Sequence, residues 1–199
     1  MTLPSIVIAL TAGSVGAGLP AAMHPDTACV IMLPNDVPRA GRKSPLDSLT
    51  FKVGNQSVKL CYGRPSAKGR TMIGGKAVPY DTIWRTGANE PTTVYAPIPL
   101  VVAGVTAPAG SWTLYTVPGR TEWQVIVNRS TSQWGEEHYY KGAVRAQEVG
   151  RGKVPSETVK DPIETFTIRA EPGPNGGATL VLEWEQTRVR VPVQAGAAK

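Results

Sequence analysis

Many short runs of the sequence alternate between apolar and polar residues, and turn-forming residues separate these runs. The clearest pair is Ser48–Val53 and Gln56–Tyr62, which are joined by Gly54 and Asn55. A two-residue connection whose first position favours a positive φ is typical of a tight β-hairpin. We therefore predict an antiparallel hairpin at this point, and this pattern constrains the fold more than any other feature of the chain.

Seven further runs alternate or are continuously apolar, with turn signals between several of them. Nine strands with almost no helix are typical of an antiparallel sandwich or closed sheet and not of a parallel sheet. We predict an all-β fold, an antiparallel β-sandwich or a jelly-roll-like barrel with one long irregular loop segment. The seven runs are Thr92–Val102, Ser111–Val117, Glu122–Asn128, Tyr139–Val149, Glu164–Ala170, Ala178–Glu185 and Arg188–Val193.

The length of 199 residues suits one domain with a proper core. The strand pattern covers residues 48–193, which we predict to be a single β domain. Residues 23–47 are rich in proline, polar and charged residues and are predicted to be a linker. Residues 194–199 are predicted to be a disordered tail.

The first 22 residues resemble an export signal. Ile6–Leu19 is an apolar run of the length found in secretory signals, and small residues follow at Ala21 and Ala22. The run is too short to span a bilayer. No lysine or arginine precedes it, so the sequence leaves open an upstream start, or an apolar N-terminal strand instead of a signal. We expect export to the periplasm or the extracellular space, with association to the cell envelope as a further option.

The chain has two cysteines, Cys29 and Cys61. In an exported chain an even pair favours a disulfide, here between the N-terminal extension and a predicted strand. Two alternatives stay open, which are a lipid anchor on Cys29 and two free buried thiols.

The segment from Arg64 to Thr93 has no clean period and is dense in glycine, proline and polar residues, with one short helical turn predicted near Thr82–Arg85. Irregular segments of this length inside a compact domain tend to be functional. Arginine forks match carboxylates and phosphates, and aromatic side chains beside them offer a flat wall for sugars. We predict a site for a small polar or anionic ligand or a glycan, formed by Arg64, Lys68, Arg70, Tyr80, Trp84, Arg85, Thr86, Asn89 and Glu90. The competing interpretation is that the loop uses its charges structurally, for instance in a pair between Arg85 and Glu90.

Other kinds of site find little support in the sequence. The two histidines, His24 and His138, form no metal motif, and the sequence contains no nucleophile elbow and no phosphate-binding loop, so we predict no metal and no cofactor. An alternative function is a small hydrolase or transferase that uses Glu90, His138 or Glu183 as acid or base. A further alternative is a structural envelope protein without a small ligand. The oligomeric state is left open.

The net charge is +6, and nine of the basic residues lie between Arg39 and Lys76 against one acid, Asp47. A nucleic-acid interface would interleave such charge with several stacking aromatic residues, but Phe51 and Tyr62 are the only aromatic residues in this stretch. We therefore do not expect a nucleic-acid partner.

The chain resembles a bacterial family of exported proteins, the domain of unknown function 2911. The resemblance rests on ordered motifs at Arg64–Arg70, Val78–Tyr80, Ile83–Glu90, Pro108–Gly119, Trp134-Gly135 and Leu182–Glu185. It covers roughly residues 48–193 and implies a domain extent and an exported or envelope-associated location. It implies no activity.

Overall fold

The computed structural model describes residues 28–29 and 42–197. The predicted export signal, residues 1–22, lies outside the described residues, as does most of the predicted linker. Within the described part of the chain, the helices are too short and too polar to cross a membrane.

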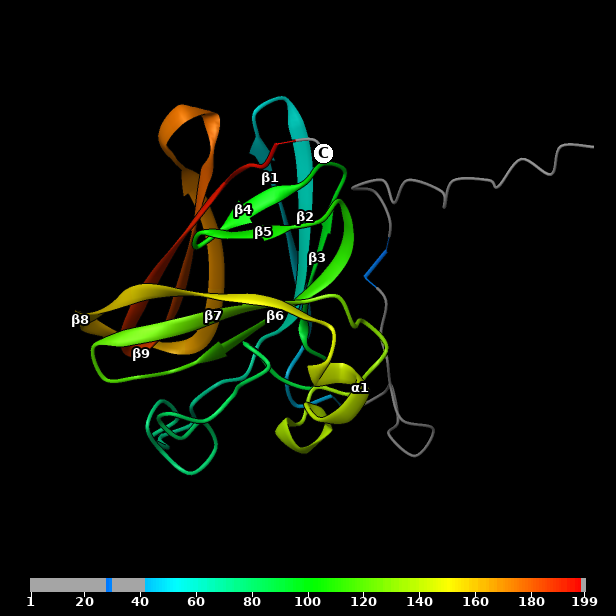
Figure 1. Cartoon of the computed structure of the whole chain (residues 1–199). Coiled ribbons are helices and arrows are strands. Elements are labelled where there is room, and N and C mark those ends of the chain that lie inside the picture. Colours follow the sequence, from blue (N-terminus) through cyan, green and yellow to red (C-terminus); the bar gives the residue numbers. More distant parts are fainter. Residues whose placement is uncertain (1–27, 30–41, 198–199) are drawn as a thin grey trace, which may run out of the picture.

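Nine antiparallel strands form one sheet in the order β1-β2-β3-β6-β7-β8-β9-β4-β5 (Figure 1). The sheet does not close, since β1 and β5 remain at its two ends. This confirms the predicted all-β antiparallel class. The strands are β1 Leu46–Val53, β2 Gln56–Gly63, β3 Thr92–Ala96, β4 Leu100–Val102, β5 Val105–Ala107, β6 Gly110–Val117, β7 Glu122–Asn128, β8 Glu148–Pro172 and β9 Ala178–Ala195.

The predicted hairpin is confirmed, because β1 and β2 pair in register up to Val53 and Gln56, and Gly54-Asn55 forms the turn. The first turn position favours glycine because of its backbone conformation, since Gly54 has a positive φ of 56°. Space is not the reason, because no atom lies within contact distance of an added Cβ. The inward residues of both strands, such as Val58 and Leu60, are fully buried.

Two long strands bend the sheet around its core. The first part of β8 pairs with β7 and the rest with β9, and the pairing with β9 shifts register twice. Glu185, at the second shift, adopts a positive φ of 51°. Such irregularities bend a strand and increase its twist, so the two parts of the sheet face one another across one continuous apolar core.

The predicted strand Tyr139–Val149 was wrong. The chain instead forms a 3-10 turn, η1 Glu137–Tyr139, and a short helix, α1 Gly142–Arg145, before β8 begins. Tyr140 and Val144 lie four residues apart and pack on the same small cluster with Tyr115, which is helical spacing. In this run Tyr140 is buried, Val144 is half-buried and Tyr139 is exposed, so neither the burial nor the period is that of the predicted strand.

Three other boundaries also differ from the prediction. The run Thr92–Val102 is two strands because Pro97 and Pro99 interrupt it. No helical turn forms at Thr82–Arg85, where Trp84 instead makes a β-bridge to Thr116. The first two residues of the predicted tail belong to β9, since Gln194 and Ala195 pair with β4.

Candidate functional site

The irregular segment after β2 is held against the sheet at several points. Ser66 forms an antiparallel bridge with Thr165, and Trp84 forms one with Thr116. Trp84 is 3% exposed and stacks on Trp184 with ring centroids 5.9 Å apart. It is therefore a core residue, and in this structure it offers no exposed wall for a ligand.

The first arginines of the predicted site bind the protein itself. Arg64 pairs with Asp47 at 3.2 Å and donates a hydrogen bond to the Thr167 hydroxyl at 3.1 Å. Arg70 donates from Nε to the carbonyl of Ala67, 2.9 Å away. Both guanidinium groups thus brace the start of the irregular segment.

Glu90 and Arg85 do not pair with one another. Glu90 is 4% exposed and accepts two hydrogen bonds of 2.6 Å from Arg42, a residue of the predicted linker. Arg85 reaches Glu137 at 3.4 Å, and its Nε is buried without a hydrogen-bond partner among the described residues. Gly135 lies so close that an added Cβ would be 2.5 Å from the Arg85 Cδ, so the two loops fit only with glycine there.

The other members of the predicted site have mixed surroundings. Thr86 is buried and donates to the Thr116 hydroxyl, and Asn89 donates to the carbonyl of Ser44. The Arg120 guanidinium lies 4.6 Å from the centre of the Tyr80 ring. Lys68 has an exposed side chain, while its backbone N–H binds Glu164. The structure therefore does not bring the nine predicted residues together around one cavity.

A polar hollow of about 280 Å³ does open beside the same segment. It lies where the segment meets β6, β7, α1 and the start of β8. The lining residues are Asp81, Ile83, Val117, Gln124, Tyr140, Arg145 and Arg151. Two arginines, an amide and a tyrosine thus converge on one small space with two apolar side chains.

A hydrogen-bond network that runs from the exposed Arg151 to the buried Asn128 fixes the floor of this hollow. Arg151 donates to both carboxylate oxygens of Glu148, at 2.6 and 2.9 Å, and to the side-chain oxygen Oε1 of Gln124 at 3.1 Å. The Tyr140 hydroxyl donates to Glu148 at 2.8 Å and accepts from the buried Asn128 amide at 3.1 Å. The site is therefore preorganised, because each of these side chains has its position set by at least one partner.

The same network sets the protonation states. Hydrogen bonds from Arg151, followed by the one from Tyr140, hold the pKa of Glu148 below its ordinary value. Burial, reinforced by the contact with Glu148, raises the pKa of Tyr140. At neutral pH the floor thus consists of a carboxylate, a guanidinium and a neutral phenol.

Arg145 and Asp81 stand at the rim of the hollow. The Arg145 side chain is exposed, and no acceptor among the described residues binds its guanidinium. Asp81 is also exposed, and its backbone N–H bonds to the Pro118 carbonyl at 2.8 Å. The rim thus offers an available cation to an anionic group and a carboxylate to a hydroxyl or amine.

The carboxylates considered for acid and base chemistry are bound to arginines. Glu183 lies between Arg169 and Arg188, at 3.0 and 2.6 Å. Burial alone would raise the pKa of Glu183, but the hydrogen bonds from these two arginines together lower it. His138 is exposed and lies 3.4 Å from Glu136. Among the described residues, three or more histidine, cysteine, aspartate or glutamate side chains nowhere gather as they would to hold a metal ion.

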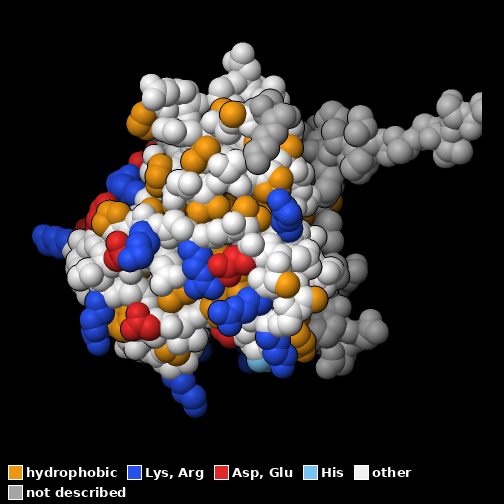
Figure 2. Space-filling view, in the orientation of Figure 1, with side chains coloured by type: hydrophobic (Ala, Val, Ile, Leu, Met, Phe, Trp, Pro, Cys, Tyr) orange, Lys and Arg blue, Asp and Glu red, His pale blue; other side chains and the backbone are white. Residues whose placement is uncertain are grey.

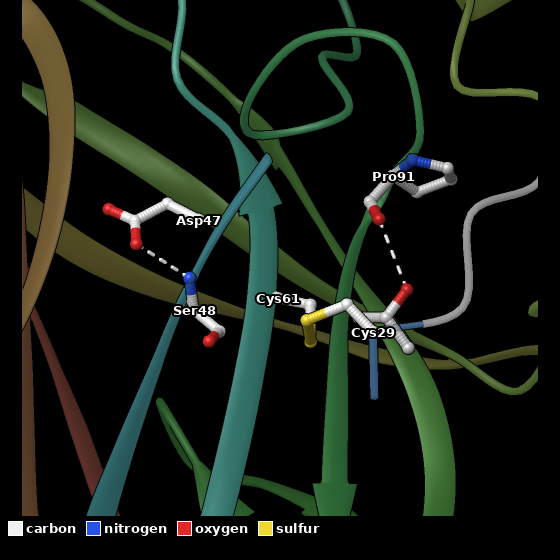
Figure 3. The surroundings of a disulfide bond; sticks show 6 residues. Cys29, Asp47, Ser48, Cys61 and Pro91 are labelled. Carbon is white, nitrogen blue, oxygen red and sulfur yellow. Dashed lines mark hydrogen bonds between the residues drawn. A yellow bond between two sulfur atoms is a disulfide. The ribbon is translucent and has the colours of Figure 1, made fainter. Parts of the chain in front are cut away.

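Cys29 and Cys61 form a disulfide, with a Cα–Cα distance of 5.9 Å (Figure 3). The predicted bond is confirmed, and the Cys29 sulfur is therefore engaged in it. Together with the contact between Arg42 and Glu90, this bond fixes the predicted linker to β2 and to the loop before β3 at two points.

Sequence patterns alone contain little sign of the residues that line the hollow. Gln124 belongs to an alternating strand, in which a polar residue is ordinarily a solvated one. Arg145 and Tyr140 fell within a predicted strand that does not form. Arg151 and Glu148 are three residues apart at the start of β8, a spacing that on a strand puts side chains on opposite faces. A signal existed in hindsight only in the apolar spacing of Tyr140 and Val144.

Comparison with known proteins gives one match. A model of the family DUF2911, which is described as protein of unknown function, matches residues 44–193. No curated protein and no solved structure matches the chain.

Proposed function

This chain belongs to the DUF2911 family, whose function is unknown, and we propose that it is an exported binding module for a small anionic ligand such as a sugar acid or a short dicarboxylate. The convergence of Arg145, Arg151 and Gln124 on one hollow carries the proposal. The ligand lies beside the irregular segment, as the sequence suggested, but is held by side chains from α1, β7 and β8.

The size and chemistry of the hollow support a small ligand. Its volume of about 280 Å³ is slightly below the range of about 300–1,000 Å³ that is common for drug-sized ligands. The Arg145 guanidinium is available to a carboxylate of the ligand. The Arg151 guanidinium is already held by Glu148, so it can donate to the ligand only through the N–H groups that do not bind Glu148 or Gln124. Ile83 and Val117 offer an apolar wall for the carbon skeleton.

Export is supported by two features. The apolar run near the N-terminus has the length of a secretory signal, and the Cys29–Cys61 disulfide is of a kind that persists in oxidising compartments. Edman or mass-spectrometric determination of the N-terminus of protein purified from its native host tests this proposal. An intact residue 1 on the mature protein would contradict it.

Titration calorimetry with D-glucuronate, matched against D-glucose, tests the ligand class. The two sugars differ by one carboxylate, so binding of glucuronate with much weaker binding of glucose is expected. Replacement of Arg145 by alanine removes a charge-assisted hydrogen bond and should weaken glucuronate binding by about 10- to 100-fold. The melting temperature should stay unchanged, since the side chain is exposed.

Arg129→Ala is the matched control, because Arg129 is an exposed arginine that lines a different hollow. It should leave glucuronate binding unchanged. Equal losses in the Arg129 and Arg145 variants would show a nonspecific charge effect. If neither glucuronate nor a dicarboxylate such as succinate binds at millimolar concentration, the proposal fails.

A further inference from the structure

A larger hollow on the described part of the molecule lies elsewhere, along the edge of β1 that faces away from β2. Its volume is about 500 Å³. One wall is Leu49–Lys52 of β1, and the other is Ile168–Pro172 near the end of β8. Among the described residues, β1 pairs only with β2, and this part of β8 pairs only with β9, so both walls are strand edges without a neighbouring strand.

The backbone of β1 presents two residues to this groove. Backbone groups of successive residues in a strand point to opposite edges. The carbonyl of Pro45 accepts from the N–H of Arg64, so odd-numbered residues face β2. The N–H of Gly54 points to the other edge of β1, where it binds the carbonyl of Gly176 in the turn that joins β8 and β9. Even-numbered residues therefore face away from β2. Thr50 and Lys52 therefore direct their N–H and C=O groups into the groove.

The same reasoning applies to β8. The N–H of Phe166 binds the carbonyl of Pro65, and the N–H of Ile168 binds the hydroxyl of Tyr62 at 3.0 Å. Even-numbered residues of β8 thus face β1. Ala170, the next even-numbered residue, directs its N–H and C=O into the groove, and no backbone bond joins it to β1 within the described residues.

The chain already adds an extended segment to this edge just below the groove. Ser66 makes an antiparallel bridge to Thr165 there. The pairing of the added segment ends at Ile168, whose backbone N–H and carbonyl are hydrogen-bonded to the Tyr62 hydroxyl. From Arg169 to Pro172, the edge of β8 that faces β1 has no strand partner in the part of the chain that the structure describes, and Pro172 has no N–H to donate.

The two walls have the same direction. β1 ends beside Gly54, which bonds to the turn that follows the end of β8. A single strand that runs antiparallel to both could therefore pair with both edges at once. Antiparallel pairing is also the arrangement that Ser66 and Thr165 show.

The side chains around the groove indicate which segment fits. Phe51, Ile168 and Ala178 are buried and give the groove an apolar floor. At the rim, Glu171 is paired with arginines, whereas the Lys52 ammonium binds the Ser57 hydroxyl and has no carboxylate partner among the described residues. Lys52 therefore leaves an uncompensated positive charge. On the face shown in Figure 2, by contrast, many basic side chains stand directly beside acidic ones.

We propose that this groove binds an extended segment of a partner polypeptide, with an acidic side chain opposite Lys52, by addition of a strand between β1 and β8. Backbone hydrogen bonds to Thr50, Lys52 and Ala170 supply the affinity, and Lys52 selects the charge of the segment. This site is distinct from the hollow of the proposed small ligand, and it would complete the sheet where the chain leaves it open.

Fluorescence anisotropy with labelled peptides tests the proposal on the whole protein. The probe is a blocked pentapeptide of alternating threonine and valine with a central glutamate, compared with the same peptide carrying a central lysine. We expect the glutamate peptide to bind with a dissociation constant on the order of 1 mM or tighter. N-methylation of its central backbone amide should weaken binding by at least about tenfold, because one hydrogen bond is lost and a methyl group enters the gap.

A charge reversal separates this site from general attraction to a basic protein. Lys52→Glu should reverse the preference, so that the lysine peptide binds more tightly than the glutamate peptide. The matched control is Lys76→Glu, which changes the same charge at an exposed lysine outside the groove and should keep the original preference. Arg145→Ala should not affect peptide binding, so a failure here is distinguishable from a failure of the small-ligand site.

Three results would overturn the inference. These are no saturation by either peptide at millimolar concentration, equal binding of the N-methylated peptide, and equal effects of the Lys52 and Lys76 variants. The last two are ratios measured on folded protein, so they are informative even if the peptide affinity is low.

Discussion

Loss of Arg42 should destabilise the domain although sequence patterning puts this residue in a linker. Its guanidinium donates two hydrogen bonds of 2.6 Å to Glu90, and the side chains of the pair are 12% and 6% exposed. Arg42→Met leaves the Glu90 carboxylate buried without its counter-charge. Removal of one partner from a buried pair costs about 3–5 kcal/mol, and at about 2–4 °C per kcal/mol for a domain of this size the lower figure corresponds to a fall in melting temperature of roughly 6–12 °C.

Differential scanning calorimetry of a double-mutant cycle checks this reasoning. Glu90→Leu alone should also destabilise, since it orphans Arg42, but the combination with Arg42→Met should recover much of the loss because no unpaired charge remains buried. The control is Lys153→Met, which breaks the exposed pair with Glu122 and should lower the melting temperature by less than about 2 °C. If Arg42→Met costs no more than Lys153→Met, residue 42 is not anchored as described.

Four further perturbations have a defined direction. Replacement of Cys29 and Cys61 by serine opens a link between residues separated by 32 positions, and chain entropy predicts a loss of about 3–4 kcal/mol in denaturant unfolding; an unchanged midpoint would contradict it. Glu148 has a lowered pKa in the folded state, so its contribution to stability is complete above its ordinary pKa of 4.5 and is lost as the pH falls further; Glu148→Gln should flatten the acid limb of a melting-temperature profile. Burial raises the pKa of Tyr115 to about 12 from 10.0, so stability that is complete below pH 10 is lost toward pH 12, and Tyr115→Phe should flatten that alkaline limb. Trp84→Ala should cost about 3–5 kcal/mol in urea unfolding, and a small loss would refute its place in the core.

The strands were predictable from alternation or from continuous apolar runs. β1 alternates between exposed and buried residues in its second half, and the hairpin that it forms with β2 carries its own turn signal at Gly54-Asn55. β6 and β7 are buried over most of their length, so their apolar and β-branched content was the signal instead. Prediction failed where apolar residues are buried by a different geometry. Tyr140, which follows η1, and the half-buried Val144 of α1 pack on one small cluster, and their four-residue spacing was outweighed by neighbouring valine and aromatic residues.

The contacts of the irregular segment were not predictable, because they depend on residues remote in sequence. The sequence suggested that Glu90 pairs with Arg85, five positions away. The structure instead pairs Glu90 with Arg42, 48 positions away, and Arg85 with Glu137, 52 positions away. Composition could show that charged side chains of both signs were present, but only the folded sheet decides which of them meet.

The irregular segment pairs with the sheet like a strand at Ser66 and Trp84. Each proposed site lies next to one of these two points, where the pairing stops. Between Ser66 and Trp84, the backbone N–H groups of Met72 and Ile73 donate to the Glu185 carboxylate of β9. Beyond Ser66 and the contact between Ile168 and the Tyr62 hydroxyl, the edge of β8 pairs with no other strand among the described residues, which leaves the groove beside β1. Beside Trp84, Asp81 and Ile83 turn away from the sheet and form one wall of the small polar hollow. The arginines of this segment are engaged with the protein itself, so in the proposed small-ligand site the positive charge comes from Arg145 and Arg151 on the opposite wall.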